Sequence, residues 1–435
     1  MNEALIGCLG LCLLLALFLT GIELAFAMTF VGFVGFACLR SLPAAIDLLA
    51  KDYFDAFASY AFVVIPLFVL MGQIAFNSGM AEQLYGTARK FVGHVPGGLA
   101  LATVVGATIF KAISGSTLAT AATFSSVAIP EMDKYGYSRK LSTGVVASVG
   151  TLGMLIPPSG TLIILAMVTD QSIGKLFLAG IIPGLLVALM FLIAIVGWCG
   201  ANPSLAPKGT PVRWTERLKS VPQIFWPLLI FVITIGGLLA GFFTPTEAGS
   251  VGSIAVLALT VMKRDLDTKA LLKSVRESLY MGCMVLMLLG GSAVLGHFVV
   301  ISKIPGIMAA WTLSLPLSPY MIMGVIILIY LLGGSFIDDI AFMVLATPIF
   351  FPVAVKLGLD PIWFSIVIGM TLMIGVIIPP VAVSAFVVKN ITRESIGVVY
   401  RGVLPFLLSL FFCLALLFIF PGLATFLPRL MAGMR

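Results

Sequence analysis

Long stretches without a charged residue alternate with short polar connections along the whole chain. Four of them cover residues 278–302, 304–337, 361–388 and 402–428. Each exceeds the roughly 20 apolar residues that a membrane-spanning helix requires. The pattern therefore predicts an all-α, polytopic membrane protein that crosses the bilayer many times.

The same pattern places the individual helices. It predicts them near residues 4–19, 22–39, 57–78, 176–198, 223–241, 247–262, 278–299, 319–333 and 403–420. The connections 208–219 and 263–276 are rich in Lys and Arg, which is typical of cytoplasmic loops. The turn FTPTEAG at 243–249 then belongs on the opposite face, where Pro245 and Thr246 suit the start of a helix.

Composition excludes several classes of protein. The chain is 60% hydrophobic and 10% charged, whereas soluble domains carry about 25% charged residues. The net charge of +7 lies in short loops and does not indicate nucleic-acid binding. The six cysteines have no CxxC spacing, so neither disulfides nor zinc are expected. No GxSxG, HExxH or Walker A motif occurs, so we expect no enzyme, no organic cofactor and no direct use of ATP.

The sequence contains an internal repeat. At a constant offset of 222 residues, the separation of Pro130 and Pro352, several Gly and Pro residues coincide. The matching pairs are Gly136 with Gly358, Gly153 with Gly375, Pro157 with Pro379, Pro158 with Pro380, Gly180 with Gly402, and Pro183 with Pro405. Proline averages about one residue in twenty, so ungapped matches of this kind indicate two structural repeats.

Each repeat has a Gly- and Ser-containing break followed by a helix interrupted at IPP. The breaks are ISGST at 113–117 and GGSFIDD at 333–339, and segments 96–130 and 320–352 fit hairpins that enter the membrane and return. Non-helical backbone at membrane depth is tolerated only inside protein or beside a cavity. Paired interrupted helices indicate the midplane binding site of a secondary transporter. The alternative is that the prolines only shape helix packing.

Whether the repeats are inverted depends on segment 303–316. Counting it as a crossing gives antiparallel repeats, and omitting it gives parallel ones.

The IPP breaks supply hard oxygen ligands. Proline lacks an N–H, so each break leaves carbonyl groups that need a donor or a cation. Carbonyls of Gly153 and Ile156, with the hydroxyls of Ser114 and Ser116, would form a cage for a monovalent cation such as Na⁺. The second repeat offers a matching cage from Gly334, Asp338, Gly375 and Ile378. The helices that start after Pro158 and Pro380 would direct positive dipole ends at an anionic substrate.

Several further side chains are candidates for ligand contacts. Lys111 lies in a stretch otherwise free of charge, and either meets an anionic substrate or snorkels to the interface. Asp338 and Asp339 either bind a cation or form a solvated turn. Ser159, Thr161 and Ser384 follow the breaks and are candidate substrate contacts, although such hydroxyls often bond to a helix carbonyl instead.

These motifs resemble the large, M-type membrane subunit of the tripartite ATP-independent periplasmic (TRAP) transporters. The resemblance covers most of the chain. It is carried by ISGSTLATAATFSSVAIPEMDKYGY (113–137), GVVASVGTLGMLIPPSG (144–160), FTPTEAG (243–249), GSFIDDIAFMVLATPIFFPVAVKLGLDPIWF (334–364) and IGVIIPP (374–380).

The resemblance implies a sodium-coupled importer in the bacterial inner membrane. It implies inverted repeats with two hairpins, and a transport domain that moves like an elevator within a scaffold. It also implies two partners, a small four-helix Q-type membrane subunit and a periplasmic P-type binding protein that delivers an organic acid. Carried over by position, it places sodium site 1 at Ser114, Ser116, Gly153, Ile156 and Pro158, and sodium site 2 at Gly334, Asp338, Thr371, Gly375 and Ile378.

Two departures from the family pattern concern the site. Where relatives often read NLEIGLITPPVGLN, this chain reads TLMIGVIIPPVAVS, so Thr371, Met373, Ile378 and Ser384 replace more polar residues. Lys111 stands where small residues are usual, which suits a small, strongly acidic substrate such as a sulfonate or dicarboxylate.

We expect four regions: N-terminal scaffold helices at 1–90, transport repeat 1 at 91–200, scaffold and arm helices at 201–300, and transport repeat 2 with the C-terminal helix at 301–435. The main alternative is a stand-alone ion-coupled organic-anion transporter without a binding protein.

Overall fold

The computed structural model describes residues 3–207, 209, 211–314, 316–336, 338–379 and 382–432, and every regular element within these ranges is a helix. The first half contributes α1 (Glu3–Leu19), α2 (Leu24–Leu39), α3 (Leu42–Ala58), η1 (Tyr60–Val63), α4 (Val64–Asn77), α5 (Met80–Val92), α6 (Gly98–Ser114), α7 (Thr117–Lys134), α8 (Arg139–Gly150), η2 (Thr151–Met154), α9 (Gly160–Val168), α10 (Ile173–Ala201) and η3 (Pro203–Leu205). The second half contributes α11 (Trp214–Ala240), α12 (Pro245–Lys263), α13 (Thr268–Ile301), α14 (Ile304–Ser314), α15 (Pro319–Phe336), α16 (Asp339–Lys356), α17 (Pro361–Gly375), α18 (Val383–Thr392), α19 (Ile396–Ile419) and α20 (Gly422–Ala432).

Eight helical segments of the described chain are long and apolar enough to cross a membrane. The predicted all-α, polytopic architecture is confirmed. Each helix predicted from hydropathy has a counterpart, but α11 and α13 begin more than two helical turns before their predicted starts at residues 223 and 278, at Trp214 and Thr268. Their polar first turns are helical for local reasons; in α13 the Asp267 carboxylate accepts a hydrogen bond from Ala270 N at 2.6 Å.

The start of α12 illustrates how local sequence sets a helix boundary. At α12 the Thr244 hydroxyl accepts from Glu247 N at 3.3 Å, and the Glu247 carboxylate accepts from Thr244 N at 2.8 Å, with Pro245 as the first helical residue. The predicted helix start in FTPTEAG is therefore confirmed.

The apolar pattern does not predict the amphipathic α3, because the charged residues of this helix interrupt the pattern.

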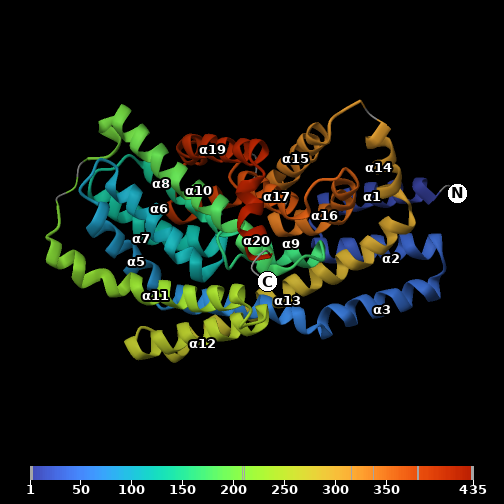
Figure 1. Ribbon diagram of the computed structural model, residues 1–435, viewed down its shortest axis with the longest axis horizontal. Coiled ribbons are helices and arrows are strands. Elements are labelled where there is room, and N and C mark those ends of the chain that lie inside the picture. Colours follow the sequence, from blue (N-terminus) through green and yellow to red (C-terminus); the bar gives the residue numbers. More distant parts are fainter. Residues whose placement is uncertain are drawn as a thin grey trace.

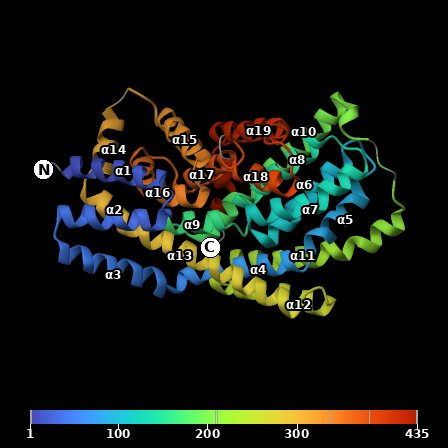
Figure 2. The ribbon, with the colours of Figure 1, turned by 180° about the vertical axis from the view of Figure 1, so that it is seen from behind.

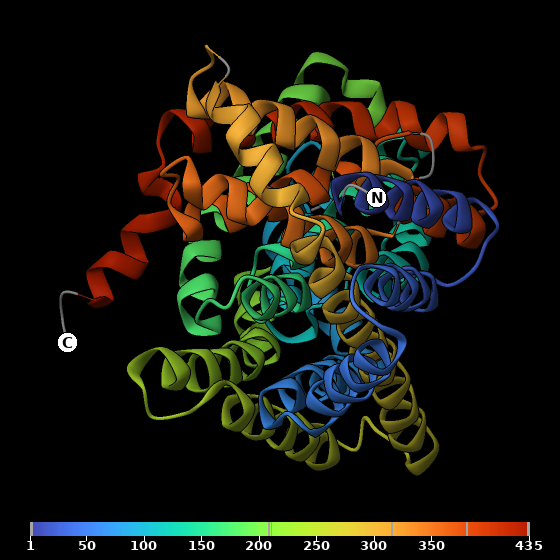
Figure 3. The same cartoon turned by 90° about the vertical axis from the view of Figure 1, so that its right-hand side faces the viewer.

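The helices form a long body with the interrupted helices in its interior. Figure 1 shows α3, α11, α12 and α13 along one long side and α15 and α19 along the opposite side, with α6, α7, α9 and α16 between them, and Figure 2 shows the same arrangement from behind. The N-terminal helix lies at one end of the body (Figure 1), while α20 projects from it (Figure 3). α13 packs against α2, α3 and α4.

The structure confirms the order of elements in the two repeats. α6 and α7 form a hairpin, followed by a broken helix made of α8, η2 and α9; α15 and α16 form the second hairpin, followed by α17 and α18. The offset of 222 residues carries the bounds of α7, Thr117 and Lys134, onto those of α16, Asp339 and Lys356.

Each broken helix packs against the hairpin of the other repeat. α9 contacts α16, while α18 contacts α7 and α8. The Ser384 hydroxyl of α18 donates to Ala147 O of α8 at 2.6 Å. At the equivalent contact, Leu162 of α9 lies beside Gly369 of α17. The two repeats therefore interlock through the same positions.

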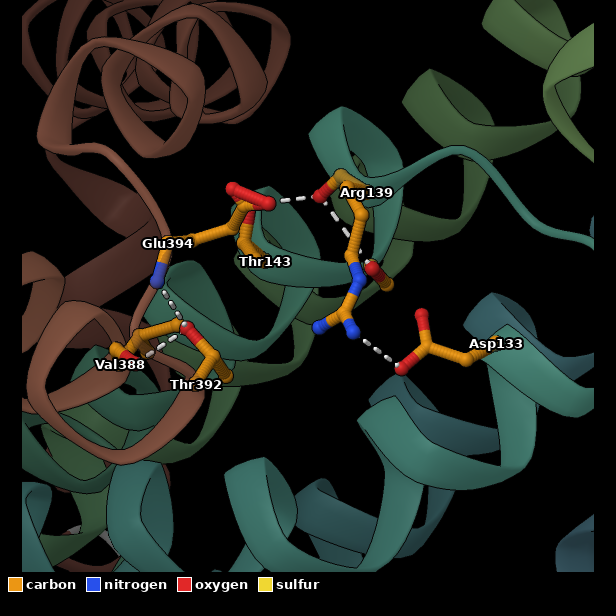
Figure 4. Close-up of polar contacts among 7 residues, drawn as sticks. Asp133, Arg139, Thr143, Val388, Thr392 and Glu394 are labelled. Carbon is orange, nitrogen blue, oxygen red and sulfur yellow. Dashed lines mark hydrogen bonds and ion pairs between the residues drawn. The ribbon is translucent and has the colours of Figure 1, made fainter.

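The interlocked region ends in a polar cluster between repeats. Figure 4 shows Arg139, at the start of α8, bonded to Asp133 at the end of α7, with the end of α18 and Glu394 beside Thr143. The Arg139–Asp133 ion pair measures 2.9 Å. The turn after hairpin 1 and the turn after the second broken helix thus lie next to each other (Figure 4).

At the close crossing of α19 with α8, the effect of a Gly→Ala substitution on stability is expected to depend strongly on its position in α19. A Cβ at Gly402 of α19 would meet Lys140 O and lie 2.9 Å from Gly144 Cα, so Gly402→Ala overpacks backbone at a cost of about 1–3 kcal/mol. Gly397 of the same helix has no atom within 4 Å of its Cβ position. We expect Gly402→Ala to lower the apparent melting temperature by several degrees and Gly397→Ala to leave it unchanged, as measured by scanning fluorimetry; equal melting temperatures would contradict the close crossing.

Candidate functional site

The first broken helix is built around a short, buried, non-α segment. α8 ends at Gly150, the backbone continues through η2 to Met154, and α9 starts at Gly160. The Ser159 hydroxyl accepts from Leu162 N at 3.3 Å, which caps α9, and donates to Met154 O at 2.8 Å. One carbonyl of this break is thus satisfied from within the break itself.

The tip of hairpin 1 packs directly onto this break. Gly115 has a φ of +58°, and a Cβ there would lie 2.6 Å from Pro158 O. Only glycine combines this backbone conformation with such close approach. Ser116 caps α7 by accepting from Ala119 N at 3.3 Å, while the buried Ser114 hydroxyl has no hydrogen-bond partner among the described residues. The predicted meeting of tip and break is confirmed for the first repeat.

The second break resembles the first in two respects, a hydrogen-bonded carbonyl and a close contact with its hairpin. α17 ends at Gly375, and Val376 O, the repeat counterpart of Met154 O, accepts from Ser384 N at 3.3 Å. A Cβ at Gly375 would lie 3.0 Å from Gly334 C and 3.2 Å from Gly334 O, so the hairpin backbone touches the broken helix here too. Pro380, where we predict the positive end of a helix, lies outside the described residues.

The remaining residues of predicted sodium site 2 have defined local roles. The exposed Asp338 caps α16, with Oδ1 accepting from Ala341 N at 3.1 Å. Thr371 is buried and donates to Val367 O at 2.8 Å. Ile378 is half-buried, and its N–H donates to Ile374 O at 3.0 Å. In site 1 the corresponding Ile156 is buried against Gly184 of α10.

The predicted substrate residues lie in this region but have different surroundings. Lys111 is fully buried, so it does not snorkel to an interface, and its Nζ donates to Ser116 O at 2.5 Å. Ser159 and Ser384 are buried and use their hydroxyls in the bonds to Met154 O and Ala147 O. Thr161 is buried in the first turn of α9.

Sequence reasoning missed two features of the site. One is Gly115, which ends α6 with a positive φ and directly precedes Ser116, the N-cap of α7. The other is the placement of Lys111 against Gly153, where a Cβ would lie 2.6 Å from Lys111 Nζ. No sequence signal gives the latter, because it depends on how hairpin and break pack.

The ligand chemistry of the site suits a hard cation. Within the described residues no three His, Cys, Asp or Glu side chains are grouped to hold a metal ion. Backbone carbonyls and hydroxyls instead gather at the hairpin tips, and the unpartnered Ser114 oxygen is an available ligand. Oxygen donors of this kind fit Na⁺ and do not fit zinc.

Two interlocked repeats, each joining a hairpin tip to a broken helix inside a polytopic membrane protein, define a membrane transport protein. A family model for the tripartite ATP-independent periplasmic transporter, DctM component, matches residues 11–423. The chain belongs to this family and is a multi-pass protein of the bacterial inner membrane.

Named relatives cover nearly the full chain. The C4-dicarboxylate TRAP transporter large permease protein DctM of Pseudomonas aeruginosa is 36% identical over 389 residues, covering 89% of this chain and 90% of that protein. The sialic acid TRAP transporter large permease protein SiaM of Vibrio cholerae is 32% identical, covering 96% and 97%. The isethionate TRAP transporter permease protein DctMQ of Oleidesulfovibrio alaskensis is 32% identical, covering 90% of this chain and 61% of that protein.

A solved structure shares the fold at low identity. The Alcanivorax borkumensis YdaH transporter, described as having an unusual topology, aligns with a TM-score of 0.61 and 14% identity, over 88% of this chain and 89% of that one. This similarity supports the fold alone.

The contact between tip and break predicts local opening when it is disturbed. Gly115→Ala would place a methyl group against Pro158 O in an unfavourable backbone conformation. We expect faster amide hydrogen exchange in segments 111–118 and 153–160, measured by mass spectrometry. Gly160→Ala is the matched control, because nothing lies within 4 Å of its Cβ position. Identical exchange in both variants would mean that the tip does not depend on this contact.

Proposed function

We propose that this chain is the substrate-translocating subunit of a sodium-coupled transporter that imports a small organic anion. The observation that carries the proposal is the paired contact of a hairpin tip with a broken helix, Gly115 with Pro158 and Gly334 with Gly375. It gathers backbone oxygens in two buried places, one in each repeat, and α9 adds a helix N-terminus beside the first. Oxygens favour a cation, and helix N-termini favour an anion.

The substrate is proposed to be a carboxylate or sulfonate. Relatives are named for C4-dicarboxylates, sialic acid and isethionate, and each of these carries an acid group. The N-terminal turn of α9, with Ser159 and Thr161, faces the same break and is the proposed anion-binding element. Lys111 and Ser384 flank the breaks and complete the candidate set.

Family membership supports the proposed partners. TRAP large permeases are expected to act with a small membrane subunit and a periplasmic substrate-binding protein. The rows of exposed apolar residues on α1, α2, α3, α11 and α13 are compatible with lipid and a membrane partner. For the mechanism we propose an elevator, in which the interlocked hairpins and broken helices move as one body against α2, α4, α12 and α13.

Reconstitution tests the proposal directly. Proteoliposomes containing this chain, its small membrane subunit and its binding protein are expected to accumulate substrate only with an inward Na⁺ gradient. The substrate is first chosen by thermal-shift screening of the binding protein against dicarboxylates, sialic acid, isethionate and ectoine. Uptake that persists in choline would contradict sodium coupling, and uptake of free substrate by this chain alone would favour the stand-alone transporter.

Asp338 offers a test of sodium site 2 that separates charge from helix capping. Asparagine caps helices as well as aspartate does, so Asp338→Asn keeps the bond to Ala341 N but removes the charge. We expect the half-saturating Na⁺ concentration to rise roughly tenfold, the effect of about 1.4 kcal/mol, in Na⁺-dependent uptake. Asp267→Asn is the control, since Asp267 caps α13 in the same way away from the site. An unchanged Na⁺ dependence of Asp338→Asn would remove this carboxylate from the site.

A further inference from the structure

The two repeats differ at one equivalent position beside the breaks. In repeat 2, position 333 is glycine, the Phe342 ring packs against it, and Gly375 contacts the backbone of Gly334. In repeat 1 the equivalent of Gly333 is Lys111, and its side chain fills the space against Gly153. A Cβ at Gly153 would lie 2.6 Å from Lys111 Nζ and 2.8 Å from Cδ. A lysine side chain therefore enters one cage and not the other.

The amino group of Lys111 lies at the hairpin tip predicted to form sodium site 1. Its Nζ donates to Ser116 O at 2.5 Å, at the tip whose Ser114 hydroxyl is buried and unpartnered. An ammonium group has three N–H donors and no acceptor, so it takes the same kind of ligands as Na⁺. Lys111 is 0% exposed and belongs to the largest fully buried side chains.

The volume of the Lys111 side chain decides whether Na⁺ can also occupy this cage, because that side chain fills the space against Gly153. A positive charge on the amine adds to the exclusion: at an effective dielectric constant of about 20, two unit positive charges about 4 Å apart repel strongly enough to lower affinity roughly a thousandfold. Among the described residues no carboxylate lies within ion-pair distance of Lys111, whose side chain is fully buried. The Lys111 side chain and Na⁺ therefore exclude each other at site 1.

We propose that the Lys111 side chain takes the place of the sodium ion at site 1, so that Na⁺ binds only at site 2. This inference rests on the proposed sodium coupling. It assigns Lys111 a role other than substrate binding, because its ammonium is directed at Ser116 O in the tip.

Counting bound sodium ions tests the inference without a transport assay. The purified full-length chain is titrated with NaCl at constant ionic strength, with choline as the replacement ion. The slope of stabilisation against the logarithm of Na⁺ concentration gives the number of ions bound on folding, and isothermal titration calorimetry provides a second count. The wild type is expected to bind about one Na⁺, and Lys111→Ala about one more.

Two further variants control for volume and for loss of a lysine. Lys111→Met keeps the side-chain bulk without charge, so it is expected to leave the Na⁺ count unchanged while lowering stability in choline. Lys134→Ala removes an exposed lysine from the same hairpin and is expected to match the wild type in every measurement.

The possible failures are distinguishable. Two sodium ions bound by the wild type would overturn the inference while leaving sodium coupling intact, and this count is informative even if Lys111→Ala fails to fold. An unchanged count in Lys111→Ala together with weakened binding of the transported anion would make Lys111 a substrate ligand instead. Absence of any Na⁺ effect in wild type and variant alike would overturn the sodium-coupling proposal as well.

Discussion

The backbone N–H and C=O groups of the two interrupted helices need hydrogen-bond partners inside an apolar interior. The rest of the architecture depends on how these partners are supplied. In lipid each unsatisfied peptide group costs several kcal/mol. The protein encloses both breaks within its own helices and brings a second backbone, the hairpin tip, against each of them. Met154 O and Val376 O, at equivalent positions, each receive a hydrogen bond from a serine that begins a following helix.

The same constraint explains why the repeats share their glycines and differ in their polar side chains. Gly153 and Gly375 allow close approach of a hairpin, and this need is the same in both halves. The groups that approach them are not: a lysine side chain meets the first, and a glycine backbone meets the second. The two halves thus share their backbone geometry but differ in the side chain that reaches the break. Such a difference allows the two halves of a repeated fold to bind different ligands.

Much of the fold could be predicted because it follows from properties of single segments. Hydropathy gives the long apolar helices, such as α10 and α19, and the proline offset gives the repeated order of hairpin and broken helix. The amphipathic α3 escapes the same reasoning, since its stability comes from packing on α2 and α13. The site residues could be located to their segments, but their partners could not. That Lys111 is buried rather than snorkelling, and that the Ser159 hydroxyl closes its own break, are consequences of contacts between segments.

The exchange of packing partners between repeats has a mechanical consequence. Because α9 rests on the second hairpin and α18 rests on the first, neither half can shift without carrying part of the other. The Ser384 bond to Ala147 and the crossing of Gly144 with Gly402 tie the halves at separate levels. A force on either hairpin is thus distributed over both breaks, and in the proposed transporter the two sites would change surroundings together. Joint movement of the two sites is the structural condition for tightly coupled transport, in which neither ligand crosses the membrane without the other.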